Sequence, residues 1–221
     1  MRFLVRSIIV KLTDRDLALV RCVNRFGFLT VAQVARFWGG IDFSTAAARV
    51  RKLVDEGILQ RADMQHFDVR PLLVTDRGRM LAGDTLPSIK SIRATTYRHD
   101  NMLFDLAMGL EKKFCARFET EREYRWRRPD RAGQFHVPDG LLRRDKSTIG
   151  IELELTQKAP RRLAEIIASH AVNLELDEVW YVVTDETMRG YVQRVAGDSS
   201  HIKIVKWTPG GAAAAKEGER K

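Results

Sequence analysis

The sequence predicts an α/β (α+β) protein of two domains: an N-terminal domain of helices and one β-hairpin, then a domain of order αβββαβαβ with a central mixed sheet. Helix caps and an apolar period of 3.6 residues mark the first domain, and helical patterns alternate with apolar strands in the second. Polar, turn-forming residues separate the two. The predicted boundaries are residues 1–83, a linker over 84–97, a second domain over 98–207 and a disordered tail over 208–221.

Cap signals predict the first two helices. Thr13 precedes an apolar helical pattern and is followed three residues later by Asp16, which is the arrangement of a capping box. Thr30 caps a shorter second helix, and Gly39 and Gly40 end it.

A third helix is predicted over residues 44–57, with Ser44 as its N-cap and Gly57 as a left-handed C-cap. Over residues 44–52 its outward face carries Thr45, Ala48, Arg49 and Lys52 and no acidic side chain. A helix that enters the major groove of DNA needs such a face. The opposite face is apolar: Ala46, Ala47, Val50, Leu53 and Val54.

Two short strands, 58–61 and 70–75, flank a polar loop that contains Gln65 and His66, and a closing helix follows over 76–82. Three helices followed by such a hairpin predict a winged helix-turn-helix domain. The alternative is a small three-helix bundle that binds other proteins. Thr45, Arg49 and Lys52 would face the major groove, Arg51 the flanking phosphates, and His66 and Arg70 the adjacent backbone or minor groove. The predicted DNA-binding residues are thus Ser44, Thr45, Arg49, Arg51, Lys52, His66 and Arg70.

The charge distribution favours the same half of the chain. Residues 1–98 hold 17 Lys and Arg against 9 Asp and Glu, and residues 99–221 hold 21 against 20, so +8 of the net charge of +9 lies in the first half. Attraction to a polyanion should come from there. A membrane surface would suit the sign, but no basic amphipathic helix or lipidation signal supports it.

The chain is expected to be soluble and cytoplasmic. Residues 3–10 are too short and too charged for a signal peptide, and no later segment approaches the length of a membrane span. Cys22 and Cys115 lack metal-ligand spacing, and Cys22 is expected to be a reduced core residue.

In the second domain, helices are predicted over 98–111, 160–172 and 185–195, and strands over 116–124, 136–142, 148–156, 177–184 and 201–207. A turn centred on Asp145 and Lys146 would pair residues whose numbers sum to 291, which places Asp139 opposite Glu152. Glu154 shares their face because side chains alternate along a strand. Opposed carboxylates repel, and Mg²⁺ held by Asp139 and Glu152 would remove that cost.

Two short segments around these acids resemble a known protein superfamily. Val137-Pro138-Asp139-Gly140 and Ile151-Glu152-Leu153-Glu154, embedded in an αβββαβ order, resemble the core of the PD-(D/E)XK nuclease superfamily. Together with the upstream winged helix and a helix that begins His99-Asp100-Asn101, they resemble the replication-relaxation family of plasmid and mobile-element proteins over residues 13–207. The resemblance implies that Asp139 and Glu152 are the metal-binding acids.

One position departs from the superfamily. Glu154 stands where its lysine would polarise the scissile phosphate and help to activate the attacking water. Lys158 could reach the site from the start of the following helix. An active site would therefore consist of Asp139, Glu152, Glu154 and Lys158, but the replacement favours an inactive domain.

The sequence thus predicts an accessory protein of plasmid replication or conjugative transfer, of the relaxosome type, that binds double-stranded DNA and does not cleave it. It would require no cofactor, and Mg²⁺ is its candidate metal. Its protein partners would be a relaxase or replication protein, and a second copy in a homodimer. A metal-dependent endonuclease and a winged-helix transcription repressor are the alternatives, and a half-solvated strand is the plain explanation of the acids.

Other chemistry-bearing residues have structural interpretations. His99 and His136 lack a partner at zinc spacing and are expected to be hydrogen-bonded structural residues. The basic, aromatic segment 122–131 would add phosphate and stacking contacts or form a solvated loop.

Overall fold

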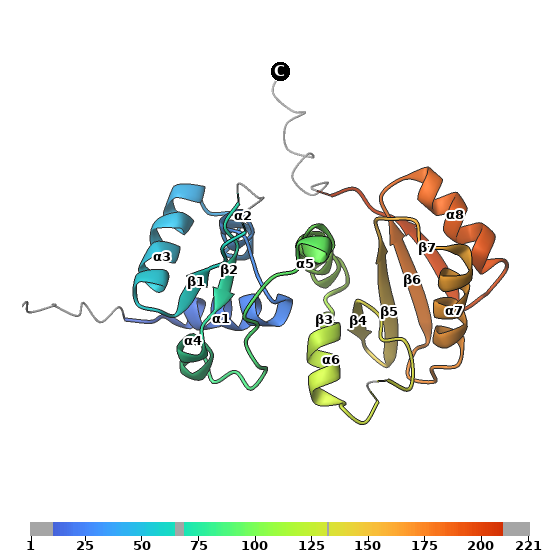
Figure 1. Cartoon of the computed structure of the whole chain (residues 1–221), viewed down its shortest axis with the longest axis horizontal. Helices are drawn as coiled ribbons and strands as arrows, with labels where there is room; N and C mark the ends of the chain where they lie inside the picture. The colour runs from blue at the N-terminus through green and yellow to red at the C-terminus, as the bar shows by residue number, and fades with distance from the viewer. Residues whose placement is uncertain (1–10, 65–68, 132, 210–221) are drawn as a thin grey trace, which may run out of the picture. The chain divides into compact units, whose positions relative to one another are not determined.

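A computed structural model describes residues 11–64, 69–131 and 133–209, which form two compact units, 1–97 and 98–221. Over these ranges the protein is mixed α/β, with eight helices, a two-stranded sheet and a five-stranded sheet (Figure 1). Gln65, His66 and most of the predicted tail lie outside the described residues. No helix in the described ranges has the length and apolar character needed to cross a membrane.

The first unit follows the predicted order of elements. Three helices, α1 (Asp14–Phe26), α2 (Val31–Phe37) and α3 (Phe43–Asp55), precede strands β1 (Leu59–Arg61) and β2 (Leu72–Val74) and helix α4 (Asp76–Leu81). The two strands pair antiparallel, and Leu29, which precedes α2 in the sequence, forms an isolated antiparallel β-bridge with Leu72.

Capping fixes where these helices begin. Thr13 and Thr30 cap α1 and α2 in full capping boxes, as predicted. The predicted N-cap of α3 is wrong: Asp42 caps it, because its carboxylate accepts from the amides of Ser44 and Thr45, and Ser44 lies in the first turn. Gly57 follows the helix with φ +65°, the left-handed conformation expected there.

Residues of the predicted linker pack on the first unit. The side-chain amide of Asn24 in α1 donates to the carbonyl of Leu86 over 2.6 Å. The rings of Phe28 and Tyr97 stack with centroids 5.2 Å apart, and Ile89 and Ile92 join the same apolar cluster. This stretch therefore contributes to the core of the first unit.

The second unit is built on the sheet β3-β4-β5-β6-β7. Helix α5 (Ala94–Phe114) leads into β3 (Arg117–Thr120), α6 (Glu121–Arg127), β4 (Gly140–Arg144) and β5 (Ser147–Glu154). The chain continues through α7 (Pro160–Ala171), β6 (Glu178–Val183), α8 (Glu186–Ala196) and β7 (Ile202–Lys206). Strands β3, β4 and β5 are antiparallel and β5, β6 and β7 parallel, so the sheet is mixed, as predicted.

Two predicted strands are shorter than expected. Residues 121–124 belong to α6, because Thr120 and Glu123 form a capping box that begins a helix directly after β3. The strand predicted from His136 begins only at Gly140. Pro138 has no backbone N–H to donate to a ladder, which opposes an earlier start.

Helices cover both faces of this sheet (Figure 1). Phe114 of α5 packs edge-on against Trp180 of β6, with ring centroids 5.5 Å apart. The next residue, Tyr181, faces His170 of α7. Because neighbouring residues of a strand point to opposite faces, α5 and α7 lie on opposite sides of β6.

A charged pair lies inside the first unit. Asp16 of α1 is fully buried, and its carboxylate accepts from the Arg49 guanidinium of α3, with Nε–Oδ1 at 2.9 Å, and from the amide and hydroxyl of Thr13. The Arg49 side chain is only 21% exposed. The expectation that Arg49 is a freely exposed residue of α3 is therefore wrong, because burial of Asp16 requires a cation beside it.

We expect Arg49→Ala to lower the free energy of unfolding by about 2 to 4 kcal/mol, because breaking a buried pair costs about 3 to 5 kcal/mol and Thr13 still serves the carboxylate. Arg51→Ala is the matched control: Arg51 is exposed on the same helix and should change stability by less than about 0.5 kcal/mol. Equal effects of the two variants in urea denaturation would contradict a structural role for Arg49.

Asp16 should also make the stability depend on pH. Burial raises its pKa, but the hydrogen bonds from Arg49 and Thr13 outweigh burial and lower the pKa to about 2. This contribution, about 1 to 2 kcal/mol, is present above pH 4 and lost as the pH falls toward 2. The free energies of unfolding of the wild type and Asp16→Asn, measured in urea, should differ less as the pH falls from 5 to 2.5. A difference that stays constant over this range would contradict a stabilising role of the ionised Asp16.

Candidate functional site

The exposed side of α3 keeps most of the residues predicted to contact DNA. Ser44, Thr45, Arg51 and Lys52 are exposed, and neither Arg51 nor Lys52 makes an ion pair with a described residue. Between Ser44 and Lys52 the exposed positions carry no acid, since Asp42 precedes the helix. Arg70 is exposed just before β2, and Arg49 belongs to the buried pair with Asp16.

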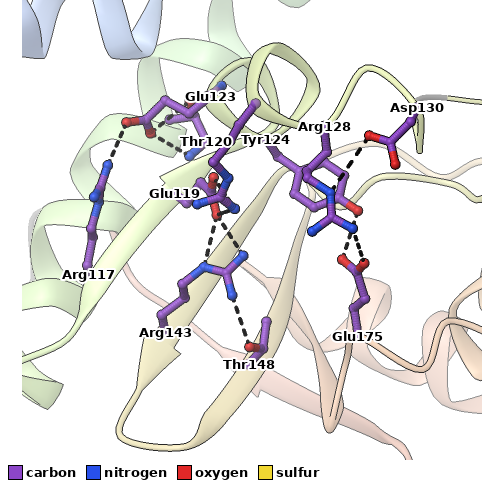
Figure 2. A network of polar contacts seen from close by, with 11 residues as sticks. Arg117, Glu119, Thr120, Glu123, Tyr124, Arg128, Asp130, Arg143, Thr148 and Glu175 are labelled. Atoms are coloured by element: carbon purple, nitrogen blue, oxygen red, sulfur yellow. Dashed lines mark hydrogen bonds and ion pairs between the residues drawn. The ribbon is translucent and has the colours of Figure 1, made fainter.

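Most arginines of segment 122–131 form ion pairs with acids of the same unit, and Figure 2 shows Arg128 beside Glu175 and Asp130. Glu119 of β3 is 3% exposed and accepts from Arg127 of α6 at 2.8 Å and from Arg143 of β4 at 3.0 Å. Arg128 donates to Glu175 at 3.1 Å. Further pairs join Arg117 to Glu123 and Arg125 to Glu121. The ion pairs therefore help to hold α6 and the following loop on the sheet, while Arg125, Trp126 and Arg127 remain exposed to solvent.

The predicted hairpin brings the three acids together. The β4–β5 pairs run from Gly140↔Ile151 to Arg144↔Ser147, which is the predicted register. A side chain at Gly140 would collide with the Phe118 ring at 2.1 Å, so only glycine allows Pro138-Asp139-Gly140 to enter the sheet here. Glu152 and Glu154 share the face of β5 that is turned toward α7.

Glu152 is surrounded by two histidines. Its Oε1 lies 2.9 Å from Nε2 of His136 and 2.9 Å from Nε2 of His170, and the carboxylate is 3% exposed. Burial raises the pKa of Glu152, but the hydrogen bonds from both histidines outweigh it and hold the pKa below its usual range. His136 comes from the loop before β4 and His170 from the last turn of α7.

Asp139 forms a different set of contacts. Its Oδ2 accepts from the Leu153 amide at 2.8 Å and lies 3.0 Å from Nε2 of His99, whose Nδ1 lies 3.2 Å from Asp100. Burial lowers the pKa of His99, but the two carboxylates overcome it and raise the pKa to about 10. His99 is therefore an imidazolium at neutral pH and balances the charge of Asp139.

Lys158 does reach the acids. It lies between β5 and α7 and pairs through Nζ with Oε1 of Glu154, while its carbonyl accepts from the Tyr191 hydroxyl. Burial raises the pKa of Glu154, although Lys158 opposes this. Tyr181 stands next to Glu152 in the β5–β6 register, and burial raises the pKa of its hydroxyl.

The sequence predicted the acids of this cluster but not its histidines. His136 was expected to lack a metal-site partner, yet it meets His170 across Glu152; the ligand atoms of the three residues lie within 4.8 Å of one another. His170 was not singled out because its partners are 18 and 34 positions away, and spacing reveals metal ligands only when they are close in sequence. A histidine on the apolar face of a helix was its only signal.

Comparisons of the chain with protein-family models, with curated proteins and with solved structures each returned no match. The proposed function therefore rests on the exposed side of α3 and on the cluster of acids and histidines in the second unit.

We expect Asp139→Ala to destabilise the second unit by about 1 to 3 kcal/mol, since it leaves the Leu153 amide and the His99 imidazolium without their acceptor. If the carboxylates chiefly repelled one another, removing one would stabilise the fold instead. Thermal melting at pH 7 separates these outcomes, and Asp198→Ala, at an exposed position with no partner among the described residues, is the neutral control.

Proposed function

We propose that the first unit is a winged helix-turn-helix that binds double-stranded DNA through α3, in an accessory protein of plasmid replication or conjugative transfer. The observation that carries the proposal is the exposed side of α3, where Thr45, Arg51 and Lys52 are exposed and no acid stands between Ser44 and Lys52; the exposed acids Asp42 and Asp55 lie at its two ends. The three-helix order with a following hairpin supports it, since the third helix of that arrangement is the one that enters the major groove.

The charge balance supports the same surface. Arg49 is neutralised by Asp16, and in the second unit Glu119, Glu175, Glu123 and Glu121 neutralise the arginines of and near α6. Arg51, Lys52 and Arg70 remain exposed in the half of the chain that carries the charge excess. Such residues can release counterions from phosphates, whereas a paired arginine must first lose its partner.

We propose further that the second unit is a nuclease-like domain that does not cleave DNA and serves as the contact to a relaxase or replication protein, or to a second copy. Asp139 and Glu152, the acids that the resemblance implies as magnesium ligands, are 21% and 3% exposed and already have histidine partners. Mg²⁺ keeps several waters when carboxylates bind it, and these two carboxylates leave little room for them. The residues therefore do not fit a hydrolytic magnesium centre.

The DNA-binding proposal is tested with a charge-matched pair of double variants. Arg51→Ala/Lys52→Ala should weaken binding of the full chain to a random-sequence duplex at least tenfold, about 1.4 kcal/mol, and lower the slope of log K against log salt by about 1 to 2. The melting temperature should not change, because both side chains are exposed.

The control is Arg161→Ala/Arg162→Ala, which removes the same charge from the exposed start of α7. It should leave the affinity within about twofold of the wild type. Equal losses in the two double variants would show that charge alone drives binding, and no loss in either would remove α3 from the proposal.

An endonuclease is the second candidate, and the contact of Lys158 with Glu154 is the observation that favours it, because an amine stands beside the three acids. We expect supercoiled DNA to remain intact with Mg²⁺ or Mn²⁺. Nicking by the wild type that is lost in both Asp139→Ala and Glu152→Ala would replace the proposal of an inactive domain.

A further inference from the structure

His136, Glu152 and His170 bring two imidazoles and one carboxylate to a single point in the second unit. Both Nε2 atoms lie 2.9 Å from the same Glu152 oxygen, and all three ligand atoms lie within 4.8 Å of one another. Ligand atoms around a tetrahedral Zn²⁺ are roughly 3.4 Å apart when each is about 2.1 Å from the ion. The two contacts to Glu152 are about 0.5 Å shorter than that value, so the carboxylate and the imidazoles would have to move apart by about that amount to admit an ion.

The three residues are held in place by separate elements. Glu152 is fixed in β5, in register with Tyr181 of β6. His170 is fully buried in α7. The backbone amide of His136 donates to Ser169 Oγ at 2.8 Å, which ties the loop of His136 to α7 directly beside His170. A preorganised set of this kind lowers the entropic cost of binding a ligand.

A second observation points to a missing polar species. The Tyr181 hydroxyl and Nδ1 of His170 are both buried and have no hydrogen-bond partner among the described residues. Their rings face each other with centroids 6.3 Å apart. Buried polar atoms are normally paired, so a water is expected beside these two atoms, on the Nδ1 side of the His170 ring, where it would hold the imidazole whose Nε2 faces Glu152.

We propose that His136, Glu152 and His170 bind one divalent transition-metal ion of the zinc class. Two imidazoles and a carboxylate are a ligand set for Zn²⁺ or Co²⁺, whereas Mg²⁺ prefers oxygen ligands throughout. The set leaves one position of a tetrahedron for water. His136 is 30% exposed and lines an open depression of about 360 Å³ together with Arg125 and Arg162, whereas Glu152 and His170 do not line it, so the ion would be reached from the side of His136.

This site differs from the magnesium site that the resemblance implies. It shares Glu152 but uses His136 and His170 in place of Asp139. The ion would link the loop before β4, strand β5 and helix α7, so binding should stabilise the second unit by mass action. The proposal does not depend on DNA binding, and its test contains no DNA.

The experiment uses the full chain in a Cys115→Ser background, because Cys115 is an exposed thiol that could bind Zn²⁺ by itself. The protein is stripped with a chelator and titrated with Zn²⁺ by calorimetry, with Co²⁺ by visible absorption, and with Mg²⁺. We expect one Zn²⁺ per chain, a rise in melting temperature with Zn²⁺ that Mg²⁺ does not reproduce, and d–d absorption of tetrahedral Co²⁺.

Two variants locate the ion. His136→Ala removes the partly exposed ligand, so its apo form should melt cooperatively, and Zn²⁺ affinity should fall at least tenfold. His99→Ala removes the imidazole beside Asp139 and should keep Zn²⁺ binding. Absence of saturable Zn²⁺ binding, unchanged binding in His136→Ala, or loss in His99→Ala alone would overturn the proposal. Glu152→Gln, which keeps the size of the side chain, should also lose the Co²⁺ spectrum.

Discussion

A buried carboxylate must have a cationic or hydrogen-bonding partner, and both units of this protein depend on that constraint. Asp16 is paired with Arg49, Glu119 with Arg127 and Arg143, and Glu154 with Lys158. Glu152 receives its hydrogen bonds from two histidines. Removing an ionised carboxylate from water costs several kcal/mol, so each of these acids determines where a basic side chain has to lie.

This pairing changes what the net charge of +9 implies. The arginines that join α1 to α3 and α6 to the sheet belong to the fold, and they are poor phosphate ligands while their acids remain beside them. The basic residues with no ion pair to a described residue include Arg51 and Lys52, both on the exposed side of α3. Exposed residues such as Lys112, Lys113 and Lys146 share this property, so α3 is the candidate nucleic-acid surface because it is also the third helix of the three-helix order.

Local signals predicted much of the fold. The turn at Asp145 and Lys146 predicted the β4–β5 register, and the capping boxes at Thr13 and Thr30 predicted where α1 and α2 begin. The same kind of signal at Thr120 and Glu123 begins α6, within the segment 116–124 where a strand is predicted. Asp42 lies two residues before the predicted cap of α3, and a shift of that size is common at helix ends.

The candidate sites were less predictable, because their partners are distant in sequence. Asp16 and Arg49 are 33 residues apart, and Glu152 and His170 are 18 apart on different elements. Periodicity places Arg49 on the outward side of its helix but contains no information about the acid that reaches it from α1. Carboxylates opposed across a hairpin could be predicted, whereas the histidines that surround them required the packing of α7 on the sheet.

Amide hydrogen exchange of the full chain, with and without a DNA duplex, tests the central claim most directly, because it reports on every element in the same sample. The account predicts that DNA slows exchange in Phe43–Asp55 of α3 and leaves Pro160–Ala171 of α7 and Glu121–Arg127 of α6 unchanged. Protection confined to α6 or α7, with α3 unaffected at saturating DNA, would contradict it.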